Sequence, residues 1–268
     1  NAVDGPKDKQ DVELFFAGAL NPVMVLMPNI DRDEIRKFEE QTASWWNKKG
    51  EFKGLHDINP LRLAYIADRA PLAGKRVIDV GCGGGILAEA MAQHGARVTG
   101  IDAGDAPLAV ARSHAEASGL KIIYRRATAE ELAELSPGSY DVATCMELLE
   151  HVPDPPSVVR ACGNLVKPGG AVFFGTLNRT LRSFLLAIIA AEYILGVVKR
   201  GTHTHRRFVK PAEIDRWATD AGLLHQDLTG LYYNPVFKKM GLGGSTAVNY
   251  LMQFKKPEGI DTPHGTPR

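Results

Sequence analysis

Three side chains capable of acid–base or metal chemistry lie close together in the middle of the chain, at Glu147, Glu150 and His151. If a helix begins at Glu147, the i, i+3, i+4 spacing places all three on one helix face. Two carboxylates and an imidazole could bind a divalent cation, and oxygen ligands favour magnesium over softer metals. Alternatively, the carboxylates complement a helix N-terminus while His151 serves as a general base. The residues alone leave both interpretations open.

A glycine-rich loop is the second feature with chemical potential. The β-branched run at 77–80 leads directly into glycines at 81 and 83–85, and glycine lets a backbone approach a ligand closely. A dinucleotide-binding GxGxxG pattern would need a glycine where Ile86 stands, so the fit is to GxGxG instead. The loop therefore disfavours a dehydrogenase.

This loop resembles motif I of the class I S-adenosyl-L-methionine-dependent methyltransferases, which wraps the amino-acid part of the methyl donor. The resemblance implies that Gly81, Gly83 and Gly85 line the methionine moiety, with Asp79 near its ammonium group. Asp102, which follows the next strand, would accept hydrogen bonds from both ribose hydroxyls. The alternative is a glycine-rich turn in an unrelated α/β protein, with Asp102 capping a helix.

The elements that must position these residues alternate along the chain. Strands and helices in alternation predict parallel βαβ units, which carry their ligand at the carboxyl ends of the strands. We therefore expect a doubly wound α/β fold with a mainly parallel, seven-stranded sheet. The predicted strands are 76–80, 97–101, 121–124, 140–145, 171–176, 226–233 and 249–255. The predicted helices include one from Asp31, one from Asn59-Pro60 to Arg69, and 86–94, 107–118 and 211–221.

Composition is that of an ordinary globular protein. The 268 residues are 44% hydrophobic and 24% charged, which is enough for one large α/β domain to bury a core. A formal net charge of +1 argues against a surface built mainly to neutralise nucleic acid. Three cysteines without CxxC spacing indicate neither a disulfide framework nor a zinc site, and favour a reducing compartment.

The domain boundaries follow from changes in pattern. Residues 1–30 are expected to be a flexible extension, either a docking or leader segment or a loosely held one, and they lack the pattern of a secretory signal. The methyltransferase domain is expected at 31–256, with an inserted helical segment at 177–210. Residues 257–268 are expected to be a disordered tail.

The segment 144–155 closely resembles the ubiquinone-biosynthesis O-methyltransferases of bacteria and eukaryotes. Further segments fit the same family in the same order along roughly 31–255, which makes the resemblance far more specific than the glycine loop. These segments are Trp45-Trp46, 54–62, 165–170, 176–179, 201–203 and 248–250. The resemblance implies O-methylation of a catechol hydroxyl on a polyprenylated ubiquinone precursor, with S-adenosyl-L-methionine as donor.

The same resemblance assigns roles to further residues. Arg62 would pair with the donor carboxylate, for which a guanidinium fork is well suited, and Met146 would pack on the adenine. From their types alone, Arg62 would be a solvated helix residue and Met146 plain core. Glu147, Glu150 and His151 would be the catalytic residues and would bind magnesium, which could lower the pKa of a catechol hydroxyl from about 10.

Two single positions and one short stretch depart from the pattern expected of this family. Ala103 and Gly175 stand where larger or hydroxyl-bearing residues are expected, and His205-Arg206-Arg207 is more basic than its counterpart.

A polyprenyl substrate implies contact with a membrane or a lipid carrier. The apolar run inside 179–200 has basic residues at both ends, which is typical of a helix lying in a membrane surface; the alternative is a lid over the sheet. We therefore expect a cytoplasmic enzyme peripherally associated with the inner membrane, on the matrix side in mitochondria. Other ubiquinone-biosynthesis proteins are candidate partners, and nucleic acid is not.

Parts of the same sequence are compatible with other functions. A nucleic-acid methyltransferase would explain basic residues such as Arg206 and Arg207, but the run 154–157 comes too late after its strand and lacks an aromatic residue. The donor fold also suits other small-molecule methyltransferases. An inactive donor-binding assembly partner is disfavoured because Glu150 and His151 are intact.

Overall fold

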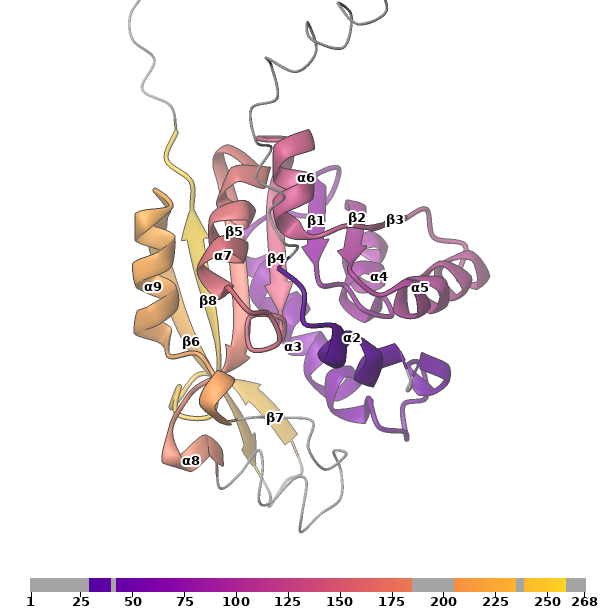
Figure 1. Ribbon diagram of the computed structural model, residues 1–268, viewed down its shortest axis with the longest axis horizontal. Coiled ribbons are helices and arrows are strands. Elements are labelled where there is room, and N and C mark those ends of the chain that lie inside the picture. The colour runs from indigo at the N-terminus through magenta and orange to yellow at the C-terminus, as the bar shows by residue number, and fades with distance from the viewer. Residues whose placement is uncertain (1–28, 40–41, 185–204, 235–238, 259–268) are drawn as a thin grey trace, which may run out of the picture.

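A computed structural model describes residues 29–39, 42–184, 205–234 and 239–258, and these form a twisted sheet covered by helices (Figure 1). The eight strands lie in the order β3-β2-β1-β4-β5-β8-β6-β7. The strands are β1 (Arg76–Val80), β2 (Arg97–Asp102), β3 (Ile123–Arg126), β4 (Tyr140–Met146), β5 (Val166–Leu177), β6 (Leu224–Asn234), β7 (Lys239–Leu242) and β8 (Asn249–Lys255). The helices are α2 (Arg32–Glu39), α3 (Lys53–Arg69), α4 (Ile86–Gln93), α5 (Asp105–Ala117), α6 (Ala129–Leu135), α7 (Pro155–Leu165), α8 (Leu181–Ser183) and α9 (Pro211–Asp220).

The predicted fold class is confirmed. Strands β3, β2, β1, β4 and β5 are parallel, whereas β8, β6 and β7 each run antiparallel to the neighbour before them. The strand order reverses between β1 and β4, and open α/β sheets bind ligands at the carboxyl ends of the strands at such a point. In Figure 1 the indigo helix α2 lies beside the tips of these two strands.

Each face of the sheet has its own apolar core. Val77 faces the core formed with α3, α4 and α5, while Ile78 and Val80 face the core formed with α6, α7 and α9. Both sets of side chains are almost completely buried. Successive strand residues point to opposite faces, so a β-branched run buried on both sides is what a central parallel strand requires.

Two expectations about the elements are wrong in detail. The sheet has eight strands, because Lys239–Leu242 adds β7 at the edge beside β6. Helix α3 begins at Lys53 and contains Pro60 in its interior, whereas the sequence predicted a start near Asn59. Leu55 and Ile58 pack into the apolar clusters, and this burial draws the preceding turns into the helix despite the missing N–H of Pro60.

The inserted segment 177–210 is described at its two ends, at 177–184 with the short helix α8 and at 205–210. The rest of the predicted membrane-surface helix lies outside the described residues, as do residues 1–28 of the extension and 259–268 of the tail. Among the helices in the described ranges, none is long and apolar enough to cross a bilayer.

Candidate active site

A cavity of about 430 Å³ opens at the carboxyl ends of β1, β2 and β4. Its lining includes most of the predicted site residues: Arg62, Asp79, Gly81, Gly83, Asp102, Met146, Glu147 and His151. Gly85 and Glu150 are not part of the lining. The N-terminal segment 29–38 closes one side of the cavity with Asn29, Ile30, Asp31, Glu34, Ile35 and Phe38. One cavity therefore joins the glycine loop to the histidine.

The glycine loop is shaped by positive φ angles and covered by a tryptophan. Gly81, Gly83 and Gly85 have φ of 71°, 50° and 86°, a region that side chains rarely adopt. A Cβ on Gly83 would lie 2.4 Å from the Trp45 ring. Gly85 turns the chain into α4, and a Cβ there would lie 2.4 Å from the Tyr124 hydroxyl. Gly81 and Gly83 therefore belong to the ligand wall, and Gly85 to packing behind it.

Asp102 is fixed at the end of β2 by the loop backbone. Its two carboxylate oxygens accept hydrogen bonds from the N–H groups of Gly83 and Gly104, both at 2.9 Å. Burial raises the pKa of Asp102, and these backbone hydrogen bonds oppose that rise. The carboxylate is therefore held in one orientation at the cavity wall.

Asp79 lies beneath the loop and is 3% exposed. Its Oδ1 accepts a hydrogen bond from the Thr144 hydroxyl at 2.7 Å. Burial raises the pKa of Asp79 to about 7, while the Thr144 hydrogen bond and the nearby Arg62 charge act in the opposite direction. An ammonium group bound at this carboxylate would stabilise its ionised form.

Arg62 projects from α3 into the cavity wall and is 5% exposed. Its guanidinium forms an ion pair with Glu147, and its Nε has no hydrogen-bond partner within the described parts of the chain. It is therefore not the solvated helix residue that its type alone suggested. A buried guanidinium with an unused donor is suited to binding a ligand carboxylate.

Met146 explains one of the departures noted in the sequence. It ends β4 opposite Gly175 of β5, and a Cβ on Gly175 would lie 2.6 Å from the Met146 sulfur. Glycine at 175 therefore leaves the volume that the methionine side chain fills. Ala103, the second departure, lines the cavity directly after Asp102.

The helix predicted to begin at Glu147 does not form. Glu147 has φ of 52°, and its N–H donates to the Gly175 carbonyl at 2.8 Å, as an extension of the strand pairing. Residues 147–153 are turns and bends, and α7 begins only at Pro155, where the Asp154 side chain caps the Ser157 N–H. The shared helix face expected for the three candidate residues therefore does not exist.

Instead, the three side chains are held by different groups, and Glu147 and Glu150 also contact each other. Glu147 pairs with Arg62, Glu150 accepts a hydrogen bond from the Thr176 hydroxyl at 2.7 Å, and Nδ1 of His151 lies 2.9 Å from Glu34. Burial raises the pKa of Glu150 to about 8. Within the described ranges no three His, Cys, Asp or Glu side chains are grouped to hold a metal ion. As arranged, the trio does not fit the predicted magnesium site.

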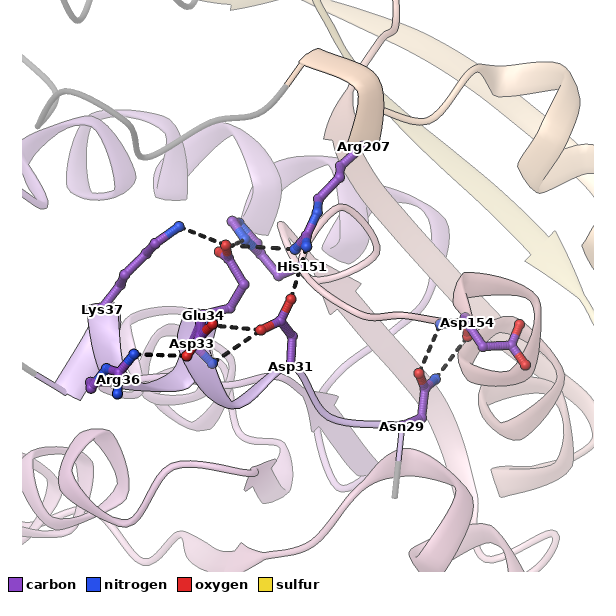
Figure 2. Close-up of polar contacts among 9 residues, drawn as sticks. All are labelled: Asn29, Asp31, Asp33, Glu34, Arg36, Lys37, His151, Asp154 and Arg207. Atoms are coloured by element: carbon purple, nitrogen blue, oxygen red, sulfur yellow. Dashed lines mark hydrogen bonds and ion pairs between the residues drawn. The ribbon is translucent and has the colours of Figure 1, made fainter. Parts of the chain in front are cut away.

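Glu34 is the site residue that the sequence did not reveal. The N-terminal segment lies over the loop after β4 (Figure 2). Asn29 exchanges two hydrogen bonds with the backbone of Asp154, each at 2.8 Å, and Asp31 pairs with Arg207 at 2.9 Å. These contacts place Glu34 against His151. An acidic residue in the first turn of a helix is common, so no local pattern marked it.

The cavity also has apolar lining residues. Ile35, Phe38, Leu177 and Met240 are among them. The Phe38 ring meets the imidazole of His151 edge-on, with ring centroids 5.1 Å apart. Such a lining suits an aromatic acceptor that carries an apolar substituent.

Comparisons with known proteins agree with this geometry. A family model described as a methyltransferase domain matches residues 55–225. The ubiquinone biosynthesis O-methyltransferase of Pseudomonas aeruginosa is 56% identical over 230 residues, covering 86% of this chain and 99% of that protein. The protein of the same name from Pseudomonas putida is 56% identical over 232 residues, 87% of this chain and 100% of its own length.

Two solved structures share the fold at low sequence identity. Magnesium protoporphyrin IX methyltransferase from Synechocystis, with bound SAH, has a TM-score of 0.58 at 19% identity and covers 93% of this chain and 100% of its own. A possible histamine N-methyltransferase from Thermotoga maritima has a TM-score of 0.60 at 16% identity and covers 83% and 99%.

Proposed function

The chain belongs to the ubiquinone biosynthesis O-methyltransferases, and from this membership we propose that it methylates a catechol hydroxyl of a polyprenylated ubiquinone precursor. The observation that carries the assignment of roles is the single cavity that joins the glycine loop to His151. When bound, S-adenosyl-L-methionine supplies an electrophilic methyl group on a sulfonium. The enzyme then has to hold the two reactants in line and to accept a proton.

The donor end is assigned to the residues around the glycine loop. Asp102 would accept hydrogen bonds from the ribose hydroxyls, since its carboxylate is already oriented by two backbone N–H groups. Asp79 would face the ammonium group and Arg62 the carboxylate of the donor. Met146 would lie against the adenine. The opposite charges of Asp79 and Arg62 match the two charged ends of an amino acid.

The acceptor end is assigned to the wall around His151. The imidazole would take the proton of the catechol hydroxyl, which is the one proton transfer that O-methylation requires. The apolar side chains Ile35, Phe38 and Leu177 would hold the ring and the first part of the prenyl chain. Glu150 does not line the cavity, so its role is to support the loop that carries His151.

A magnesium ion beside His151 would require the two carboxylates to rearrange. Glu147 and Glu150 would both have to leave their present partners, Arg62 and Thr176, before they could bind an ion beside His151. An assay in EDTA, followed by addition of magnesium, tests for such a rearrangement. If magnesium stimulates the wild type but not Glu147→Gln, the carboxylates rearrange to bind it. Equal rates with and without magnesium mean that His151 acts without a metal.

We also propose that the enzyme works in the cytoplasm at the surface of the inner membrane, because its substrate carries a polyprenyl chain. The basic-ended apolar run within 179–200 is the candidate contact. Co-sedimentation with anionic vesicles, comparing the wild type with Ile188→Asp, tests this, and equal binding would contradict it. Pull-down of other ubiquinone-biosynthesis proteins with and without vesicles would then separate protein partners from membrane binding.

The experiment for the function is a methyl-transfer assay with labelled S-adenosyl-L-methionine. Three acceptors are compared: a catechol with a short prenyl chain, the same catechol without it, and the prenylated ring with both hydroxyls already methylated. We expect a monomethyl ether of the first, slower turnover of the second and none of the third. Turnover that ignores the prenyl chain would favour a different small-molecule substrate.

A further inference from the structure

We propose that Glu34 is a positioning residue for methyl transfer, holding His151 through its Nδ1 so that Nε2 faces the acceptor hydroxyl. The inference rests on the proposed function, in which His151 is the base, and adds a residue from the N-terminal segment to that site. Figure 2 shows the arrangement: Glu34 comes from α2, and His151 from the loop after β4.

The contact between these residues is short, buried and specific. The Oε2 of Glu34 lies 2.9 Å from Nδ1 of His151, and the two side chains are 11% and 12% exposed. They are 117 positions apart in the chain, so the contact is made by folding and not by local sequence. Both residues line the cavity.

The charge state of Glu34 determines which histidine nitrogen carries hydrogen. Lys37 pairs with the Glu34 carboxylate at 2.7 Å and favours its ionised form. An ionised carboxylate can only accept hydrogen bonds. Nδ1 must then be the donor, and in the neutral imidazole the lone pair lies on Nε2, ready to accept a proton.

The two carboxylate oxygens of Glu34 contact different partners. Oε2 serves His151, whereas Oε1 pairs with Lys37 at 2.7 Å and lies 3.6 Å from Arg207. Lys37 and Arg207, near Oε1, keep the carboxylate ionised and hold it in place. Oε2 is then available to the imidazole of His151. This is the division expected of a carboxylate that orients a base and stabilises the imidazolium formed when the base takes a proton.

The charged groups around His151 act mostly in one direction. The pKa of His151 lies above its ordinary value: burial lowers it, and the hydrogen bond with Glu34 is the largest influence that raises it, with the charges of Glu150 and Glu147 acting in the same direction. The opposing cations, Lys37 and Arg207, contact Glu34 and not the imidazole. A stronger base matches the phenolic acceptor more closely in pKa, which favours proton transfer.

The test uses Glu34→Gln, with Asp33→Asn as the matched control. Asp33 lies in the same helix, is 78% exposed and pairs only with Arg36 among the described side chains. The first readout is the pKa of His151, which is measured by NMR in the full chain with SAH bound. The second is the pH profile of kcat for a short-chain prenyl catechol.

Glu34→Gln should lower the pKa of His151 by at least about one pH unit and reduce kcat roughly tenfold to a hundredfold, without changing the Kd of SAH. The acidic limb of the kcat pH profile of Glu34→Gln should move to lower pH. Asp33→Asn should match the wild type in both readouts. If Glu34→Gln folds poorly, Glu34→Asp, whose shorter side chain retracts from Nδ1, should show the same direction of change.

A His151 pKa and a pH profile that match the wild type in Glu34→Gln, or in Glu34→Asp, would overturn the inference. His151→Gln keeps this outcome separate from the proposed function. If His151→Gln retains the wild-type rate, the assignment of the base is wrong. If His151→Gln is inactive while Glu34→Gln is unchanged, only the role of Glu34 is wrong.

Discussion

Arg62 in α3 and Glu147 at the end of β4 form an ion pair in the wall of the cavity, across 85 positions of the chain. In the proposed arrangement Arg62 binds the carboxylate of the donor, and Glu147 already pairs with that guanidinium. Donor binding would then exchange one carboxylate for another at Arg62. Glu147 would therefore compete with the ligand.

The competition predicts opposite effects for the two partners. Glu147→Gln should bind SAH several-fold more tightly and be less stable, by about 1–3 kcal/mol, because the buried guanidinium loses its counter-charge. Arg62→Gln should bind SAH more weakly. Titration calorimetry and thermal unfolding measure both. If Glu147→Gln weakens binding as much as Arg62→Gln does, Glu147 contacts the donor and does not compete with it.

Asp79 predicts that donor binding is coupled to proton release. Its pKa of about 7 means that the free protein is partly protonated at neutral pH. A bound ammonium favours the ionised form, so the proton leaves, and affinity should rise between pH 6 and 8 and then level off. Calorimetry of SAH binding in buffers of different ionisation enthalpy counts the released proton. Asp79→Asn should abolish the release; proton uptake by the wild type would contradict the assignment.

Glu150 predicts a pH dependence of folding stability. Its pKa is raised from 4.5 to about 8, so between these values the native state binds a proton that the unfolded chain does not. Stability from this group is therefore lost as pH rises through that window. Glu150→Gln mimics the protonated acid and should gain about 1–3 kcal/mol over the wild type from pH 5 to 9.

Chemical denaturation across this pH range checks the prediction, and Glu116→Gln on the exposed side of α5 is the control. A constant difference between Glu150→Gln and the wild type at all pH values would mean that Glu150 is ionised in the native state.

The position of Gly84 in the glycine loop leaves no room for a side chain. A Cβ there would lie 2.2 Å from the Trp45 ring, and the Trp46 Nε1–H donates to the Gly84 carbonyl at 3.0 Å. Gly84→Ala should cost about 1–3 kcal/mol through overpacking and weaken SAH binding. Gly54→Ala, with no atom within 4 Å of its Cβ, should keep or raise the melting temperature. Additive effects of Gly84→Ala and Trp45→Ala would contradict a direct clash between them.

Much of the fold could be predicted because strand burial leaves a strong pattern. The bounds of β1 and β8, Arg76–Val80 and Asn249–Lys255, agree with the runs of strand-forming residues. β7 was missed because Lys239–Leu242 has four residues and includes Gly241, so its pairing with β6 and not its propensity makes it a strand.

The site was less predictable because its key relationships are long-range. The spacing of Glu147, Glu150 and His151 has meaning only if a helix forms, and the left-handed backbone of Glu147 prevents it. Trp45 packs on the glycine loop, and Glu34 contacts His151. Both contacts join segments that are far apart in the chain. Local patterns indicated the proposed donor end, whereas tertiary contacts determine the geometry around His151.

The most direct measurement is a crystal structure of the enzyme with SAH and a short-chain prenyl catechol bound together. The account predicts SAH on the glycine loop with its ribose on Asp102, and one catechol oxygen about 2.6–3.2 Å from Nε2 of His151. A catechol bound with both oxygens away from His151, or SAH bound away from Asp102, would contradict it.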